Sequence, residues 1–258
     1  MDVKTAREEP KDREDLIEGR NAVQEAIRAG RPIDKIYAAK GETDRRLARL
    51  LAIARDEGIV VTECDRRKLD AMSATGAHQG IIAVAAVRGY CEIEDILAAA
   101  QERGEAPFVI LCDEITDPYN LGAILRTAEC AGAHGVIVPR RRSAGLTAAV
   151  DKASAGAAEH IPVARVNNVT DAIRRLKEAG LWVYGTSVKG ENNIWDTDMT
   201  GPACLVVGSE GSGMSRLVEE SCDVLVRIPM NGRLDSLNAS VAAGVAIYEI
   251  LRQRGKGN

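Results

Sequence analysis

The sequence predicts an α/β protein whose larger part is built on a mainly parallel sheet. Short apolar runs that suit buried strands alternate with longer segments in which apolar residues recur every three or four positions. Two of these runs, Leu205–Val207 and Val224–Ile228, each end in a loop of Gly, Ser, Asn and Glu. Because strand–helix alternation produces parallel sheets, and ligands bind beyond the carboxyl ends of their strands, both loops are expected at one edge of the sheet.

Length and composition allow one large domain or two modest ones and exclude several classes of protein. The 258 residues are 45% hydrophobic, but one Phe and two Trp leave Ala, Val, Ile and Leu to fill the core. The six cysteines form no CxxC pair and the three histidines lack metal-ligand spacing, so no metal and no disulfide framework are expected. The charged N-terminus resembles no signal peptide, no apolar run is long enough to span a membrane, and a cytoplasmic location is expected. The net charge of −4 gives no global sign of nucleic-acid binding, although a local basic patch is compatible with it.

The chain is expected to divide into four segments. Residues 1–17 are charge-rich and predict a disordered or loosely attached N-terminal tail. Residues 18–88 predict a compact α/β module, residues 89–106 a linker with a connecting helix, and residues 107–258 the larger domain.

The module over residues 18–88 alternates helices and strands. A helix begins after Gly19, and Gly30 suits the position just beyond its end. Asp44 is placed to cap a second helix, which Gly58 ends. The remaining elements are strands over 33–39, 59–62 and 81–87 and a short helix over 66–72.

The larger domain continues the same alternation after a connecting helix over 96–103. Its first long helix carries Leu121, Ile124 and Leu125 on one face, and Ser236 is placed to cap its last helix. Predicted strands cover 108–112, 136–138, 163–166, 181–184, 205–207 and 224–228, and predicted helices cover 120–131, 147–158, 170–180 and 237–252.

Three motifs of the larger domain form a specific combination. They are Asn120–Thr127, Gly208–Gly213 and Ile228–Ser240. Together, and in this order, they closely resemble the SpoU (TrmH-type) family of RNA ribose 2′-O-methyltransferases. The resemblance covers residues 107–254 and is most similar to the bacterial 23S rRNA guanosine 2′-O-methyltransferases of that family.

The small module carries a second resemblance. Gly19–Val23 and His78–Ile82 are similar to segments of the L30e-like RNA-binding domain found on some members. Members that act on tRNA usually lack this module. The resemblance therefore implies an RNA substrate-binding domain over residues 18–88.

The family resemblance also implies a fold and a cofactor. It implies a C-terminal trefoil knot that binds S-adenosylmethionine, and a homodimer. The usual rules of chain connection would instead predict an ordinary unknotted sheet. The implied cofactor-binding residues are Thr186, Gly208, Ile228, Met230 and Leu237, and the implied catalytic residues are Asn120, Arg126, Glu210, Ser236 and Asn238.

Arg126 has three competing roles in such a reaction. Methyl transfer to a ribose hydroxyl needs the oxygen to lose its proton and to be aligned with the methyl group. The resemblance implies that Arg126 is the base, but a free guanidinium holds its proton up to a pH of about 12. Arg126 could instead clamp a substrate phosphate or stabilise the developing alkoxide. Outside a site, it would be a solvent-facing helix residue or part of a structural ion pair.

The other four catalytic candidates also have structural alternatives. Asn120 could cap a helix, and Ser236 could cap the last one. Glu210 lies between glycines, where it is either a solvated acid or an orienting partner for Arg126 or Asn120. Asn238 could be a polar residue of a first helical turn.

Candidate RNA contacts lie in both parts of the chain. In the small module they are Arg20, Asn21, His78 and Gln79, which carry the second resemblance. In the larger domain they are Arg140, Arg141 and Arg142, which follow a strand and could also form a solvated turn.

The sequence therefore predicts a cytoplasmic RNA methyltransferase that uses S-adenosylmethionine to methylate a guanosine 2′-hydroxyl of 23S rRNA. Alternatives are a tRNA ribose 2′-O-methyltransferase and a catalytically silent RNA-binding protein of ribosome assembly. A nicotinamide enzyme is disfavoured because the glycines come late and lack the dinucleotide fingerprint, and a Walker A motif is absent from the sequence.

Overall fold

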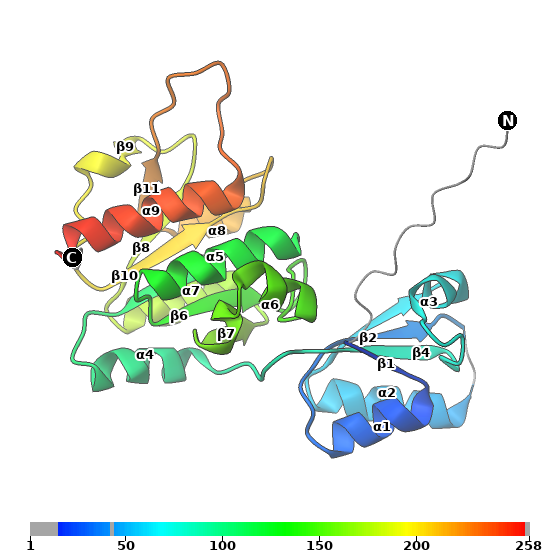
Figure 1. The fold of residues 1–258 in the computed structure, drawn as a ribbon. Helices are drawn as coiled ribbons and strands as arrows, with labels where there is room; N and C mark the ends of the chain where they lie inside the picture. Colours follow the sequence, from blue (N-terminus) through cyan, green and yellow to red (C-terminus); the bar gives the residue numbers. More distant parts are fainter. Residues whose placement is uncertain (1–14, 42–43, 256–258) are drawn as a thin grey trace, which may run out of the picture. The chain divides into compact units, whose positions relative to one another are not determined.

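The computed structural model describes residues 15–41 and 44–255. Contacts separate the chain into two compact units, residues 1–86 and 87–258 (Figure 1). Each unit has its own sheet and its own hydrophobic core. The division falls close to the boundary expected between residues 88 and 89.

The N-terminal unit is built on a four-stranded sheet with the order β1-β4-β2-β3. Strand β4 is antiparallel to β1 and β2, whereas β2 and β3 are parallel. Helices α1 and α2 contribute Val23 and Leu47 to the core around Ile36. The elements are β1 (Leu16–Glu18), α1 (Arg20–Arg28), β2 (Ile33–Ala39), α2 (Arg45–Asp56), β3 (Val60–Cys64), α3 (Arg66–Met72) and β4 (Ile81–Ala85).

Strand β1 corrects the expected N-terminal tail. Leu16 pairs with Val84 and Ile17 with Ala83, and Ile17 is only 8% exposed. The prediction that the tail extends through residue 17 is therefore wrong, because two apolar residues among charges are too short a run to indicate a strand. The rest of the expected tail, residues 1–14, lies outside the described residues.

The second unit contains a seven-stranded sheet with the order β7-β6-β5-β10-β8-β11-β9, and every pairing in it is parallel. The predicted α/β class with a mainly parallel sheet is confirmed. The strands are β5 (Phe108–Cys112), β6 (Gly135–Pro139), β7 (Val163–Val166), β8 (Trp182–Thr186), β9 (Asn192–Asn193), β10 (Ala203–Val207) and β11 (Val224–Arg227). The helices are α4 (Ile93–Glu102), α5 (Pro118–Cys130), α6 (Ala148–Ser154), α7 (Val169–Glu178), α8 (Arg216–Ser221) and α9 (Ala239–Gln253), with short 3₁₀ turns at Ala157–Glu159 and Ile194–Asp196.

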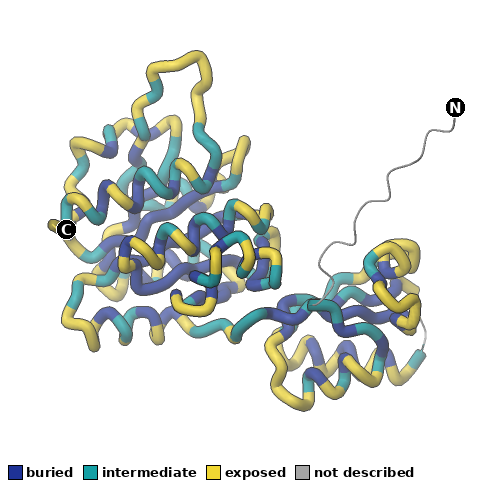
Figure 2. Tube along the Cα trace, viewed as in Figure 1, coloured by how far each residue is buried: buried dark blue, intermediate teal, exposed yellow. Residues whose placement is uncertain are grey.

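Helices cover both faces of this sheet. On one face α4, α7 and α8 contribute Ile96, Leu176 and Val218 to a core that includes Val109 and Val206. On the other side α5, α6 and α9 lie together (Figure 1). Figure 2 shows the sheet buried between the two helical layers, which fits strands that read as continuous apolar runs.

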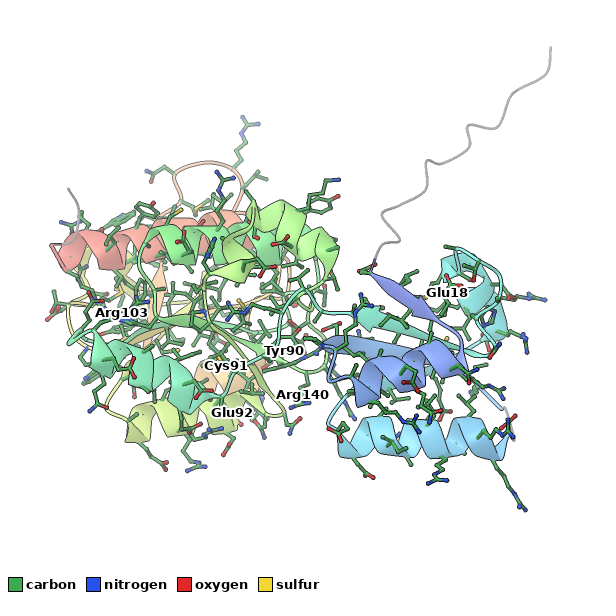
Figure 3. The ribbon with its side chains drawn as sticks, turned by 60° about the horizontal axis from the view of Figure 1, so that its bottom comes forward. Glu18, Tyr90, Cys91, Glu92, Arg103 and Arg140 are labelled. Atoms are coloured by element: carbon green, nitrogen blue, oxygen red, sulfur yellow. The ribbon has the colours of Figure 1, made fainter. Side chains whose placement is uncertain are left out.

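The segment expected to hold a linker and a connecting helix, residues 89–106, belongs to the second unit. Cys91 forms a bridge with Ala164 beside β7, and α4 begins at Ile93 with a capping box formed by Glu92 and Asp95. Figure 3 labels Cys91 and Glu92 where the chain leads into α4. The predicted helix start at residue 96 is late, because acidic residues that cap the helix resemble a polar linker in the sequence.

The chain crosses itself at the edge of the sheet. Strand β11 lies between β8 and β9, although β8 and β9 are consecutive in the chain. The segment that joins them passes directly against β11, since a Cβ on Gly190 would lie 2.9 Å from the carbonyl oxygen of Leu225. Such a crossing departs from the usual rules of chain connection. It fits the trefoil knot that the family resemblance implies.

Within the described residues, none of the helices combines the length and the apolar character that crossing a membrane requires.

Candidate functional site

A cavity of about 340 Å³ opens where β8, β10 and β11 end. These strands are parallel, so their carboxyl ends meet at the same edge of the sheet. Thr186 of β8, Gly208 after β10 and Ile228 after β11 line the cavity, together with Ala239 of α9. The two polar loops thus share one edge and one cavity, as the strand pattern predicts.

The loop after β10 folds back tightly over Gly208. Ser209 and Gly213 exchange two backbone hydrogen bonds of 3.0 Å, and Gly213 has a φ of +70° that favours glycine. A Cβ on Gly208 would lie 2.2 Å from the carbonyl carbon of Gly213 and from the amide nitrogen of Met214. Only glycine fits at position 208, and the loop brings its main chain to the cavity wall.

All five residues predicted to bind a cofactor line this cavity. Two of them have clear structural reasons for their position: Gly208 allows the tight loop, and the Thr186 hydroxyl donates to the Val206 carbonyl at 3.1 Å. Val207 and Val226 add apolar wall between them. The five are Thr186, Gly208, Ile228, Met230 and Leu237, and their contact with a cofactor stays a prediction.

Three of the five predicted catalytic residues are joined by hydrogen bonds at the cavity. Asn238 Nδ2 donates to Asn120 Oδ1 at 3.0 Å and to Glu210 Oε2 at 3.0 Å. Asn120 Nδ2 donates to the same Glu210 oxygen at 3.3 Å. Residues from α5, the loop after β10 and the start of α9, up to 118 positions apart, therefore form one network.

Helix α9 fixes the orientation of this network. Asn238 caps the helix, since its Oδ1 accepts from the amides of Ser240 at 2.9 Å and Val241 at 3.3 Å. Backbone N–H groups only donate, so the amide oxygen must face the helix and Nδ2 must face Asn120 and Glu210. The prediction that Ser236 caps α9 is wrong, because the helix begins at Ala239, further along than expected.

Asn120 does not cap α5, because Asp117 is the N-cap of this helix. Asp117 accepts from the amides of Tyr119 at 3.3 Å and Asn120 at 3.1 Å, and Pro118 is the first helical residue. Proline suits that position because its missing N–H would have no partner there. The predicted helix start at Asn120 is thus two residues late, and Asn120 can direct its side chain to Glu210.

Arg126 and Ser236 stand apart from the network. Arg126 is exposed on α5, and among the described residues its guanidinium has no hydrogen bond or ion pair. The expected contact of Glu210 with Asn120 is present, but a contact of Glu210 with Arg126 is not seen among the described residues. Ser236 lines the cavity, where its hydroxyl donates weakly to Asp235 at 3.4 Å.

Ser187, Lys189 and Glu219 also line the cavity, but no sequence pattern singled them out. Ser187 follows the end of β8, which is a position where polar residues signal a site in an α/β sheet. Glu219 lies within α8 and is brought to the cavity only by the fold. Among the residues that the structure describes, no cluster of His, Cys, Asp or Glu could hold a metal ion.

The RNA-contact candidates of the N-terminal unit divide into surface and core. Arg20 donates through Nε to the Gln79 carbonyl at 3.0 Å and pairs with Asp44, while Asn21 and Gln79 are exposed. His78 is only 2% exposed, with Nε2 beside Asp70 at 2.9 Å and Nδ1 accepting from the Gly80 amide. The prediction of a direct RNA contact by His78 is corrected, because both ring nitrogens are used inside the unit.

Glu18 holds the neighbouring loop. Its carboxylate accepts from the hydroxyls of Ser73 and Thr75 and from the amide of Ala74 at 2.6 Å. Burial raises the pKa of Glu18, but these hydrogen bonds outweigh it and lower the pKa to about 2. Figure 3 labels Glu18 on β1 near α3.

The arginine triplet follows β6 at the same edge of the sheet as the cavity. Arg142 pairs with Glu114 at 2.9 Å and has a φ of +56°, whereas Arg141 is exposed. Arg140 is half-buried and its amide donates to the Val166 carbonyl at 2.8 Å. Arg141 and Arg142 are thus both exposed to a ligand, whereas Arg140 is partly covered.

Comparison with protein families divides the chain in the same way as its fold. Residues 107–248 match the SpoU rRNA Methylase family. Residues 16–90 match the RNA 2′-O ribose methyltransferase substrate binding family. The first match holds the cavity and the Asn120–Glu210–Asn238 network, and the second coincides with the four-stranded unit.

Three individual proteins illustrate the similarity. YacO of Bacillus subtilis, named for the TrmH family of tRNA/rRNA methyltransferases, is 45% identical over 240 residues, which are 93% of this chain and 96% of YacO. The AdoMet-bound rRNA methyltransferase of Sinorhizobium meliloti is 28% identical with a TM-score of 0.59 and covers 92% of this chain and 86% of its own. The TrmH/SpoU tRNA modifying enzyme of A. aeolicus is 28% identical with a TM-score of 0.53, but covers only 58% of this chain and 76% of its own.

Proposed function

The chain belongs to the SpoU rRNA methylase family, and from this premise we propose that it methylates the ribose 2′-hydroxyl of a guanosine in 23S rRNA with S-adenosylmethionine. Membership itself indicates an RNA methyltransferase that acts on tRNA or rRNA. The observation that carries the proposal is the Asn120–Glu210–Asn238 network beside a glycine-walled cavity.

The cavity suits S-adenosylmethionine in size and in lining. Its volume of about 340 Å³ lies in the range of small-molecule sites. Val207, Val226 and Leu237 supply apolar wall, and the loop at Gly208 supplies main-chain groups that a flat heterocycle can pair with. When bound, S-adenosylmethionine supplies an electrophilic methyl group on a sulfonium.

The residues of the chain would position the attacking hydroxyl. One Glu210 oxygen is held by two amides, and its other oxygen has no partner among the described residues. That oxygen is available to accept a hydrogen bond from the 2′-hydroxyl and to orient it. Arg126, exposed and unpaired within the described chain, is suited to contact a substrate phosphate or the developing alkoxide rather than to act as a literal base.

The N-terminal unit favours rRNA over tRNA. The Sinorhizobium rRNA enzyme covers 92% of the chain and so matches both units. The A. aeolicus tRNA enzyme covers 58% of the chain, which is too little to include both units. Asn21 and Gln79 are exposed beside the half-buried Arg20, and these three residues of the N-terminal unit could contact RNA. A cytoplasmic location belongs to the same proposal.

A homodimer is also part of the proposal. On α9, Val241 is 51% exposed and Tyr248 is 50% exposed, and their spacing of two helical turns puts them on one face. Tyr119 on the neighbouring α5 is 75% exposed. A second copy covering this surface would bury these side chains and would bring its own α5, with Arg126, close to the first copy.

The test is methyl transfer from labelled S-adenosylmethionine to unmodified total RNA by wild type and Arg126→Ala. The matched control is Arg174→Ala, because Arg174 is an exposed arginine on α7 paired with Asp171 and Glu178. We expect label on a guanosine ribose of 23S rRNA, lost in Arg126→Ala with cofactor binding intact. Label on tRNA would instead support a tRNA ribose 2′-O-methyltransferase. Tight RNA binding without label would favour a catalytically silent RNA-binding protein of ribosome assembly.

A further inference from the structure

A second polar cluster lines the same cavity on the side of β8 and α8. The Ser187 hydroxyl donates to Glu219 Oε1 at 2.6 Å. The Lys189 amide donates back to the Ser187 hydroxyl oxygen at 3.3 Å. One serine therefore connects an acidic side chain of α8 with the backbone of a lysine that follows β8, and all three residues line the cavity.

The charges of this cluster are not used by the network described above. Four charged residues line the cavity, of which Glu210 is held by two amides and Asp235 accepts from Ser236. Glu219 is half-buried, and within the described residues its only side-chain hydrogen bond is the one from Ser187. Its second carboxylate oxygen is open, and Lys189 has no ion pair among the described residues. On the side of β8 and α8, the wall thus offers one negative and one positive group to a ligand.

We propose that Glu219 and Lys189 bind the amino acid end of S-adenosylmethionine, with Glu219 receiving the α-ammonium group and Lys189 the α-carboxylate. The adenosine part is neutral and suits the apolar and main-chain walls, whereas a zwitterion needs two opposite charges at one place. The inference rests on the proposed function for the identity of the ligand and adds the residues that recognise its charged end.

Ser187 fixes the orientation of the Glu219 carboxylate. Its hydroxyl occupies Oε1 and so fixes the carboxylate with Oε2 as the free acceptor. The backbone of Lys189 is fixed too, because the next residue, Gly190, packs against β11 and its amide donates to the Ser187 carbonyl at 3.0 Å. Only the lysine side chain needs to move when a carboxylate arrives, so little conformational entropy of the loop is lost on binding.

Binding of three ligands tests the proposal by calorimetry. S-Adenosylhomocysteine carries both charges, its decarboxylated analogue lacks the carboxylate, and 5′-methylthioadenosine lacks the whole amino acid end. We expect Glu219→Gln to weaken the binding of S-adenosylhomocysteine about tenfold or more and to leave the binding of 5′-methylthioadenosine unchanged. Lys189→Gln should weaken the binding of S-adenosylhomocysteine but not that of the decarboxylated analogue.

Glu220→Gln is the matched control, because Glu220 is the next residue on α8, is exposed and pairs with Arg216 at 2.9 Å outside the cavity lining. Equal losses for S-adenosylhomocysteine and 5′-methylthioadenosine in Glu219→Gln would overturn the inference and assign Glu219 to the adenosine. If wild type bound none of the three ligands, the proposed function itself would fail. Thermal unfolding of each variant separates loss of a contact from loss of the fold.

Discussion

Each unit of the chain fixes a loop with a glutamate, but the two glutamates are held by different means. In the N-terminal unit, Glu18 accepts hydrogen bonds from one short stretch, Ser73 to Thr75. In the second unit, Glu210 is held by Asn120 and Asn238, which come from separate helices 118 positions apart. The first loop depends on a single turn and the second on the whole topology of the sheet.

Because the two glutamates are held differently, the two regions should respond differently to mutation. Removing Glu18 releases the donors of Ala74 and Thr75, which water can satisfy because both residues are exposed. Removing a member of the Asn120–Glu210–Asn238 network leaves donors or acceptors of the other two without their partner beside a cavity. We therefore expect larger functional effects in the second unit and smaller, local effects in the first.

The largest effect is expected for Gly208→Ala. The new Cβ would lie 2.2 Å from the backbone of Gly213 and Met214, so the loop that carries Glu210 must move. Overpacking of this kind costs about 3 kcal/mol of unfolding free energy, and binding of S-adenosylhomocysteine should be lost. Chemical denaturation and calorimetry measure the two effects.

Gly201→Ala is the control for this variant, because a Cβ at Gly201 meets open space and its φ is not in the positive region. It should bind and unfold like wild type. Normal ligand binding by Gly208→Ala would show that the tight loop is not needed for the cavity.

The next largest effect is expected at Asn238, where two variants distinguish its role as helix cap from its hydrogen bonds to Asn120 and Glu210. Asn238→Asp keeps an oxygen for the amides of Ser240 and Val241 but loses the donor to Asn120 and Glu210. Asn238→Ala loses both. Methyl transfer should fall about 100-fold in both variants. The alanine variant should lose about 1 kcal/mol of unfolding free energy with the cap, whereas the aspartate variant keeps the cap and loses stability only through repulsion between its carboxylate and that of Glu210.

Single-turnover methylation and urea unfolding provide these measurements. Activity near the wild-type level in Asn238→Asp, with unchanged stability, would mean that Asn238 acts only as a helix cap. Glu210 would then not depend on Asn238 at the start of α9, and the contrast with the locally held Glu18 would be smaller than proposed.

The sequence predicted more of the sheet than of the contacts at its edge. The apolar runs gave β5, β6, β7, β8, β10 and β11 close to their observed positions, because buried parallel strands have a clear pattern. The two-residue β9 has no such pattern, and it was not predicted. The motifs indicated Asn120, Glu210 and Asn238 one by one, but only the fold shows that Asn238 links the other two. Glu219 was missed because nothing in the sequence of α8 distinguishes it from its exposed neighbour Glu220.

In the N-terminal unit, Glu18→Gln should loosen the loop that follows α3. An amide has one acceptor oxygen instead of two, so the amide of Ala74 and the hydroxyls of Ser73 and Thr75 cannot all be satisfied. We expect faster hydrogen exchange at Ala74 and Thr75 and a loss of about 1 kcal/mol in the stability of this unit. Glu25→Gln, on the exposed face of α1 where Glu25 pairs with Arg28 at 2.9 Å, should change neither.

The smallest effect is a pH dependence confined to this loop. The pKa of Glu18 is lowered from 4.5 to about 2, so the folded loop binds the charged form more strongly than the unfolded chain does. The stabilisation is fully present above about pH 4.5 and is lost as the pH falls through about 2. Wild type should therefore keep the NMR chemical shifts of the Ala74 and Thr75 amides down to about pH 3 and change them below it. Glu18→Gln should show no such transition, and a wild-type transition near pH 4.5 would show that the carboxylate is not held by these donors.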